Sequence, residues 1–149
     1  MPIGVMRRAA ALVALAACAQ AAQAAYAGLW FQCQPRWNAE KNYLLVQVRP
    51  GERAWNASWG ASDSAQGAAA KDKDGNLLLR GCHSRGGTPA AGCSPAKPPL
   101  FATLPRGVAD GKGLPADAAL RRGGWIRTDP AGSEQLARQC AALRPKARG

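Results

Sequence analysis

The sequence predicts an α+β domain that is mainly β: a small antiparallel β-meander, barrel-like if its sheet curls, with one C-terminal helix and disulfide staples. Short apolar segments alternate with turn dipeptides from residue 28 to residue 82. One amphipathic helical stripe follows at 133–144. Four of the five cysteines lie between positions 33 and 140, the number that two disulfides require.

Five strands are expected in the first part of the chain and a sixth, short one near its end. Pro50-Gly51 makes a turn after the second strand, and Asp74-Gly75 makes a two-residue hairpin before the fifth. Alternate residues of the second strand share one face; they are Leu44, Val46 and Val48. The expected strands are 28–34, 43–49, 53–59, 67–72, 76–82 and 125–128.

One helix is expected after the last strand. Asp129 is a suitable N-cap residue, and Pro130 suits the first helical position. The buried stripe follows the spacing i, i+4, i+7 and consists of Leu136, Cys140 and Leu143. Pro145 ends the helix, and residues 145–149 form a frayed tail.

The connection between the fifth and sixth strands is expected to be a loose Gly/Pro-rich segment, 83–124, inside a single small domain at 25–144. Large apolar side chains are scarce: residues 19–149 contain 12 Leu, 3 Val, 1 Ile and 2 Phe. A core so poor in aliphatic residues needs its tryptophans and covalent staples.

The N-terminus predicts export. Arg7 and Arg8 precede the apolar run 9–17, and small residues of the A-x-A type follow, so 1–24 is expected to be a signal peptide. The alternative is a lipoprotein signal, 1–17, because Leu15-Ala16-Ala17-Cys18 resembles a lipobox and would place a lipid on Cys18. The expected localisation is periplasmic or secreted, or lipid-anchored in the outer membrane.

The remaining four cysteines are expected to form two disulfides in an oxidising compartment. The favoured pairs are Cys82 with Cys93 and Cys33 with Cys140, and the rival pairs Cys33 with Cys82 across the sheet. Neither a metal site nor a cofactor is expected, because the spacing matches no C-x-x-C pattern. His83, the only histidine, follows Cys82 and would point to the opposite face of a strand.

The charge is uneven along the chain, with a formal net value of +11. Residues 19–79 hold 6 basic and 5 acidic residues, whereas residues 80–149 hold 12 basic and 4 acidic ones. This basic second half suits an anionic partner: an acidic polymer, lipid phosphates or an acidic protein. Nucleic acid is not expected, because export removes the opportunity, and a simple role in solubility is the alternative.

Two groups of residues are candidate contacts. An arginine-rich turn around a tryptophan suits phosphate pairing with stacking support; the partner-binding set is Arg121, Arg122, Trp125, Arg127 and Arg85. Trp55 and Trp59, four residues apart on the same face of the expected strand, could stack on glycan rings. For all three tryptophans the alternative is a place in the core, which a chain with few aliphatic residues needs.

These observations predict an exported, non-catalytic binding or accessory protein of the bacterial envelope. No stretch matches a catalytic or cofactor motif, and most carboxylates lie beside turn residues, where acids are usually solvated. The alternative function is a cell-wall-active hydrolase or a peptidoglycan- or glycan-binding module that uses Trp55 and Trp59.

Overall fold

The computed structural model describes residues 25–34, 42–59 and 62–143. The elements are β1 (Gly28–Cys33), β2 (Tyr43–Val48), β3 (Ala54–Ser58), β4 (Asp63–Lys71), β5 (Leu77–Arg85), β6 (Thr88–Pro89), β7 (Leu100–Leu104), α2 (Arg106–Ala109), α3 (Ala116–Arg122), β8 (Trp125–Thr128) and α4 (Pro130–Ala142). The expected signal peptide 1–24, the alternative lipidation at Cys18 and the tail 145–149 lie outside the described residues. No described helix is long and apolar enough to cross a bilayer.

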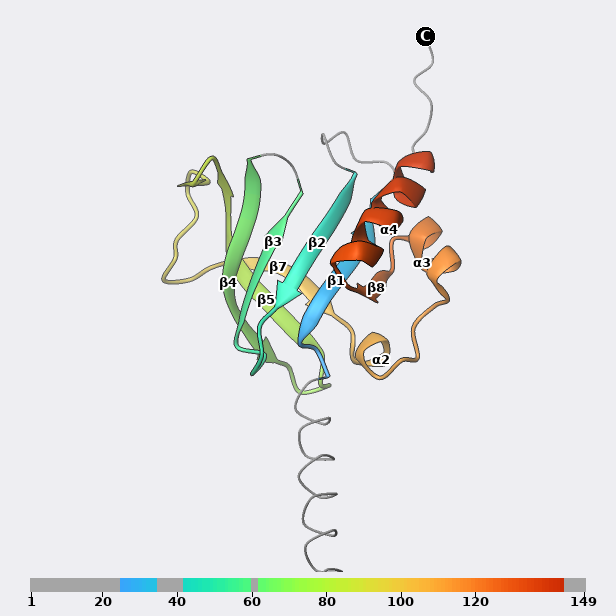
Figure 1. The fold of residues 1–149 in the computed structure, drawn as a ribbon. Helices are drawn as coiled ribbons and strands as arrows, with labels where there is room; N and C mark the ends of the chain where they lie inside the picture. The colour runs from blue at the N-terminus through green and yellow to red at the C-terminus, as the bar shows by residue number, and fades with distance from the viewer. Residues whose placement is uncertain (1–24, 35–41, 60–61, 144–149) are drawn as a thin grey trace, which may run out of the picture.

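The strands form one antiparallel sheet in the order β6-β5-β4-β3-β2-β1-β8, with β7 also paired to β5 (Figure 1). The antiparallel meander with a C-terminal helix is therefore confirmed. Within the described residues the sheet has eight strands, rather than the six that the sequence predicts. β4 begins at Asp63, before the expected position 67, because pairing with both β3 and β5 extends it through residues that carry no apolar alternation.

The sheet is strongly curled but stays open. Trp125 in β8 donates a hydrogen bond from its indole Nε1 to the carbonyl oxygen of Thr103 in β7, at 3.1 Å. These two strands lie at opposite ends of the strand order, so a side chain rather than a backbone ladder joins them. The curl gives the sheet a concave face, which holds the main core, and a convex face.

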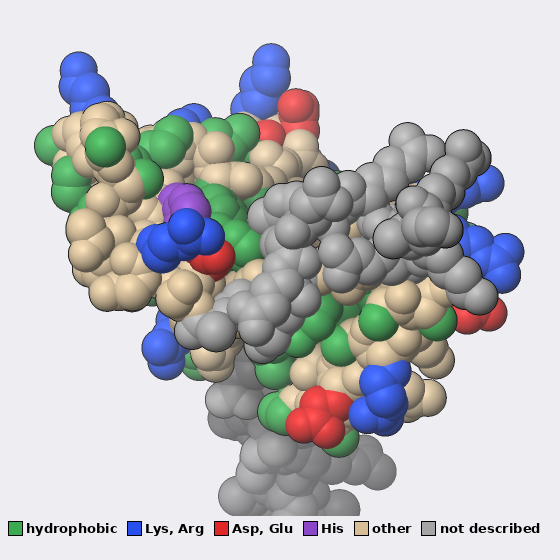
Figure 2. Space-filling model, turned by 90° about the horizontal axis from the view of Figure 1, so that it is seen from above, with side chains coloured by type: hydrophobic (Ala, Val, Ile, Leu, Met, Phe, Trp, Pro, Cys, Tyr) green, Lys and Arg blue, Asp and Glu red, His purple; other side chains and the backbone are tan. Residues whose placement is uncertain are grey.

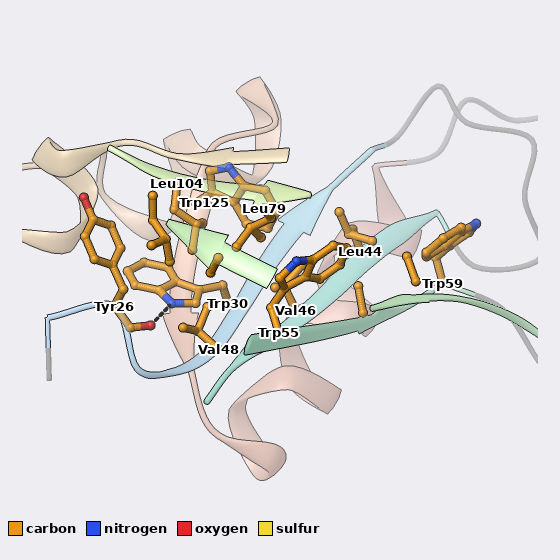
Figure 3. Close-up of a cluster of buried hydrophobic side chains, with 14 residues drawn as sticks. Tyr26, Trp30, Leu44, Val46, Val48, Trp55, Trp59, Leu79, Leu104 and Trp125 are labelled. Atoms are coloured by element: carbon orange, nitrogen blue, oxygen red, sulfur yellow. Dashed lines mark hydrogen bonds between the residues drawn. The ribbon is translucent and has the colours of Figure 1, made fainter. Parts of the chain in front are cut away.

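The concave face carries the tryptophan-rich core (Figure 3). Trp30, Trp55 and Trp125 lie there with inward-facing residues of the neighbouring strands, and the Trp30 Nε1 donates to the carbonyl oxygen of Tyr26 at 2.9 Å. The expected face of β2 is buried as predicted, and it consists of Leu44, Val46 and Val48. Indole groups thus supply the volume that the scarce aliphatic residues cannot.

A second, smaller core lies on the convex side of β1. Phe31 and Cys33 pack there against Leu120 of α3 and Cys140 of α4. In Figure 1 the two helices lie together over the β1 end of the sheet. β1 is therefore buried on both faces, with Trp30 pointing into one core and Phe31 into the other.

The α4 helix begins as predicted. Asp129 is its N-cap, and one carboxylate oxygen accepts a hydrogen bond from the backbone N–H of Gly132 at 2.7 Å. Cys140 is fully buried, but Leu143 is the C-cap residue and remains exposed. Leu143 thus falls outside the buried stripe, because the helix ends there and contacts the sheet through Leu136, Ala137 and Cys140 instead.

Both favoured disulfides are present. Cys33 pairs with Cys140 at a Cα–Cα distance of 5.6 Å, and Cys82 pairs with Cys93 at 5.9 Å. The rival pairing of Cys33 with Cys82 is wrong, since the side chain of Cys33 points toward the helices over β1. One bond joins the sheet to the last helix, and the other ties a loop to β5.

The segment 83–124 is more ordered than the sequence predicts. It contains the end of β5, then β6, β7, α2 and α3. β7 pairs with β5, and Leu104 of β7 is fully buried opposite Leu77. Gly and Pro residues hide this order from a periodicity argument, because the burial rests on a few apolar side chains that are placed by strand pairing.

Glu52 also departs from the expectation that carboxylates beside turns are solvated. It follows the Pro50-Gly51 turn, and its side chain is buried. One carboxylate oxygen accepts the backbone N–H of Tyr26 at 2.8 Å, and the other lies 3.2 Å from the Lys71 Nζ. The buried carboxylate therefore joins the start of β1 to the end of β4, which is a structural role.

Candidate functional site

Two members of the expected partner-binding set have structural roles. Trp125 is only 9% exposed and uses its indole N–H inside the fold, so its role as a stacking contact is not supported. The Arg127 guanidinium lies 4.4 Å from the Trp30 ring centroid and donates to the carbonyl oxygens of Ala25 and Ala27. Trp125 therefore joins β8 to β7, and Arg127 holds β8 against the start of β1.

Arg121 and Arg122 lie elsewhere, in the last turn of α3. Both side chains are exposed, and neither forms an ion pair with a described carboxylate. Arg138 on α4 is likewise exposed and has no ion pair among the described residues. We call these three arginines of α3 and α4 the helical basic surface.

A shallow cavity of about 220 Å³ opens between α3 and α4. Arg121 and Asp117 line it from α3, and Gln139 and Leu143 line it from α4 and its cap. The sequence continues from Leu143 into Arg-Pro-Lys-Ala-Arg-Gly, which adds three cations outside the described residues. In the sequence, three further cations therefore follow the C-cap residue of α4, which lines this cavity.

Arg85 is part of a different group, at one end of the concave face. Asp63 accepts hydrogen bonds from the His83 Nε2 at 3.0 Å and from the Arg85 Nε at 3.3 Å. Cross-strand pairing produces this contact, because Asp63 lies opposite Arg85 and Ala65 lies opposite His83. We call these three residues the rim cluster, and Figure 2 shows the histidine among basic and acidic side chains there.

The rim cluster holds its charges in place. The hydrogen bond from His83, with the nearby positive charge of Arg85, lowers the pKa of the Asp63 carboxyl below its usual value. The His83 ring also contacts Trp59, at 5.0 Å between centroids. Arg85 is therefore ion-paired within the fold, although its side chain is 78% exposed.

The rim cluster contains no nucleophile. Cys82, the residue before His83, points to the other face of β5 and is bonded to Cys93. Within the described residues, His83 contacts the carboxylate of Asp63 and the indole of Trp59, so no hydroxyl or thiol lies against its imidazole. The sequence contains one signal of this cluster: His83 and Arg85 are two residues apart on one strand, so both side chains share a face, and pairing of β4 with β5 brings Asp63 to that face.

Trp55 and Trp59 do not form a stacking platform. Trp55 is 2% exposed, donates from Nε1 to the carbonyl oxygens of Ala68 and Arg80, and stacks on Phe101 at 4.9 Å. Trp59 is also buried and lies 5.5 Å from Phe101. The glycan-stacking prediction for these two residues is not supported, because both ring faces are turned into the core.

A cavity that the sequence does not predict lies on the convex face of β4 and β5. Its volume is about 320 Å³. The outward sides of the two strands form its floor, which includes Gln66, Ala68 and Ser84. The loop between β5 and β7 forms its wall, which includes Pro89, Pro95 and Pro98. We call it the loop cavity; the only hint of it in the sequence is the recurrence of proline around Cys93.

A metal centre finds no support in the described part of the chain, where no group of three or more His, Cys, Asp or Glu side chains is arranged to hold an ion. All four described cysteines are in disulfides.

Comparison with known proteins identifies no relative from which a function could be inferred. No protein-family model matches the chain, and no curated protein or solved structure matches it at a significant level.

Proposed function

We propose that this chain is an exported, non-catalytic binding protein that holds an anionic partner on its helical basic surface. One observation carries the proposal. Arg85, Arg106 and Arg127 are occupied by contacts within the fold, whereas Arg121 and Arg122 are exposed and have no carboxylate partner among the described residues. An unpaired arginine pair attracts carboxylate or phosphate groups and favours fast, salt-sensitive association.

Export is supported by two independent features. The N-terminal residues 1–24 have the charge and apolar pattern of a signal peptide. The two disulfides suit an oxidising compartment, where such bonds persist. We place the protein in the periplasm or outside the cell, with a lipid anchor on Cys18 in the outer membrane as the alternative. The intact mass of the native protein distinguishes the two.

The non-catalytic part of the proposal rests on the rim cluster. A hydrolase built around His83 needs a hydroxyl, thiol or water that the imidazole can deprotonate. A carboxylate beside an imidazole also occurs in hydrolases, so the support comes from the other neighbours of His83: its contacts within the described residues are to Asp63 and Trp59, and neither side chain is a hydroxyl or a thiol. This arrangement favours binding over bond cleavage.

The test compares two variants with the same net charge. Arg121→Ala/Arg122→Ala removes two cations from the helical basic surface, and Arg49→Ala/Arg53→Ala removes two exposed cations beside the β2–β3 turn. Elution from phosphocellulose is measured against salt concentration. We expect the first variant to elute at clearly lower salt than the second, because a local contact depends on position and not only on net charge.

Equal elution of the two variants would contradict a defined surface and leave a general effect of charge on solubility. Co-sedimentation with anionic lipid vesicles, with an acidic polymer and with envelope proteins then separates the three partner classes. If the arginines of the helical basic surface make the contact, added salt should release the bound partner, whichever class it belongs to.

A further inference from the structure

The loop cavity is separate from the helical basic surface. The loop between β5 and β7 lies at the β5 end of the sheet, whereas α3 and α4 lie at the β1 end (Figure 1). The Cys82–Cys93 disulfide ties this loop to β5 and holds the wall of the cavity over its floor. A volume of about 320 Å³ is at the lower end of the range for small-ligand sites, about 300–1,000 Å³.

The floor of the cavity offers hydrogen bonds that the fold does not use. The Gln66 amide and the Ser84 hydroxyl make no side-chain hydrogen bond to a described residue, and both line the cavity. Asn56 lies opposite Gln66 in the neighbouring strand, and its buried Oδ1 lacks a donor in the described structure. Gln66 and Ser84 therefore offer unused hydrogen-bonding capacity in the cavity, and Asn56 offers it on the neighbouring strand.

The wall is apolar and rigid. Pro89, Pro95 and Pro98 contribute ring surfaces, and proline loses little conformational freedom when a ligand packs against it. None of the described residues that line the cavity is aromatic. The wall thus suits small aliphatic groups better than the broad face of a sugar ring, which usually packs on an aromatic side chain.

Two exposed cations lie next to residues that line the cavity, although neither is itself a lining residue. Arg80 is exposed, lies opposite the cavity residue Ala68 in the β4–β5 pairing, and has no ion pair among the described residues. Leu100, which is 49% exposed, lies opposite Arg80 in the β5–β7 pairing. Lys97 adds a second cation in the wall loop, and no carboxylate lines the cavity.

We propose that the loop cavity binds the end of a short peptide that carries a free carboxylate and small aliphatic side chains. Gln66 and Ser84 pair with the peptide amide groups, the proline wall packs against the side chains, and Arg80 pairs with the carboxylate. The cavity volume limits the bound segment to about two small residues. This proposal does not depend on the proposed function of the helical basic surface.

The test uses N-acetyl-alanyl-alanine as the probe, with its C-terminal amide and N-acetylglucosamine as comparisons. The protein is obtained by expressing the full chain with export, and binding is followed by the amide signals in ¹⁵N–¹H NMR spectra. We expect the free acid to shift the signals of Gly67, Gly81 and Ser84. The amide should bind at least about tenfold more weakly, because it lacks the charge-assisted hydrogen bond to Arg80.

Two matched variants place the site. Ala68 and Ala70 are both exposed on the convex face of β4, but only Ala68 lines the cavity. Ala68→Trp should abolish binding of the free acid, whereas Ala70→Trp should retain it. Arg80→Gln should reduce the affinity for the free acid to that for the amide and leave the affinity for the amide unchanged.

Equal binding of the acid and the amide would overturn the proposal, as would shifts of the same signals by N-acetylglucosamine or an equal loss in Ala68→Trp and Ala70→Trp. If Ala68→Trp does not fold, the comparison of acid with amide on the unmodified protein and on Arg80→Gln still decides. Arg121→Ala/Arg122→Ala should bind the probe normally, which separates this outcome from that of the helical basic surface.

Discussion

β1 lies between two layers of side chains, whereas β4 has only one. Trp30 and Phe31 of β1 are both fully buried, on opposite faces. In β4 the inward residues Ala65 and Ala69 are buried, but the outward Gln66 and Ala68 are exposed. At the β1 end, the half that α3 and α4 cover, large side chains are buried on both faces of the sheet. At the β4 end, the half that no described helix covers, the buried core depends on the tryptophans that lie across the concave face.

The two disulfides follow the same division. Cys33–Cys140 is buried, joins β1 to α4 and closes a separation of 107 residues. Cys82–Cys93 is partly exposed, spans 11 residues and holds the wall of the loop cavity. The first bond is placed to stabilise the whole fold, and the second to shape one surface.

The largest effect should come from removing the buried disulfide. Cys33→Ala/Cys140→Ala frees the unfolded chain from a loop of about 100 residues, which corresponds to about 4.7 kcal/mol in the chain-entropy model. Urea unfolding should show this loss in the free energy of unfolding. A loss no larger than that from the exposed disulfide would contradict the division between the two halves.

Removing the exposed disulfide should cost less. Cys82→Ala/Cys93→Ala opens a short loop, and the same model gives about 3 kcal/mol. We also expect the NMR amide signals of the cavity floor to shift while those of α4 stay in place. Widespread changes in the spectrum would indicate that this bond supports the whole fold.

Packing of the uncovered half can be tested at Gly81. A Cβ atom there would lie 2.8 Å from the Trp55 Cζ2 and 2.2 Å from the carbonyl oxygen of Gln66, so something must shift. Gly81→Ala should reduce the free energy of unfolding by about 2 kcal/mol, as overpacking of a core does. Gly107→Ala is the control, because no described atom beyond its chain neighbours and its own helix backbone lies within 4 Å of its Cβ position.

The helix cap is a smaller contribution to the covered half. Asp129→Ala removes the acceptor for the Gly132 N–H and should reduce the free energy of unfolding by about 1 kcal/mol. Asp129→Asn keeps an acceptor and should recover most of the loss. Equal destabilisation by both variants would mean that the carboxylate charge, rather than the hydrogen bond, stabilises the start of α4.

The rim cluster should give the smallest effect, visible as pH dependence. The folded-state pKa of Asp63 is lowered, mainly by the hydrogen bond from His83. Its contribution to stability is thus fully present above the ordinary carboxyl pKa, near pH 4, and is lost as the pH falls through the lower folded value. The stability difference between the native chain and Asp63→Asn should therefore shrink below about pH 4.

Asp74→Asn is the matched control for that measurement, because the Asp74 carboxylate has no ion pair among the described residues. A stability difference for Asp63→Asn that is the same at neutral and acid pH would contradict the ion-paired rim.

The chain by itself was enough to predict the meander, the N-cap at Asp129 and the burial of one face of β2, whereas it favoured the observed cysteine pairs without excluding a rival pairing. These features depend on local rules: alternation along a strand, turn dipeptides and capping chemistry act within a few residues. The basic character of the second half is equally a property of the sequence.

Tertiary structure decided which arginines are free, where the tryptophans point and how residues 83–124 are ordered. Arg85, Arg121, Arg122 and Arg127 look alike in the sequence, but pairing across strands gives two of them partners within the fold. β7 exists because β5 offers an edge to pair with, and its own residues carry little strand signal. Contacts between distant segments determine burial and ion pairing, so a local pattern cannot predict them.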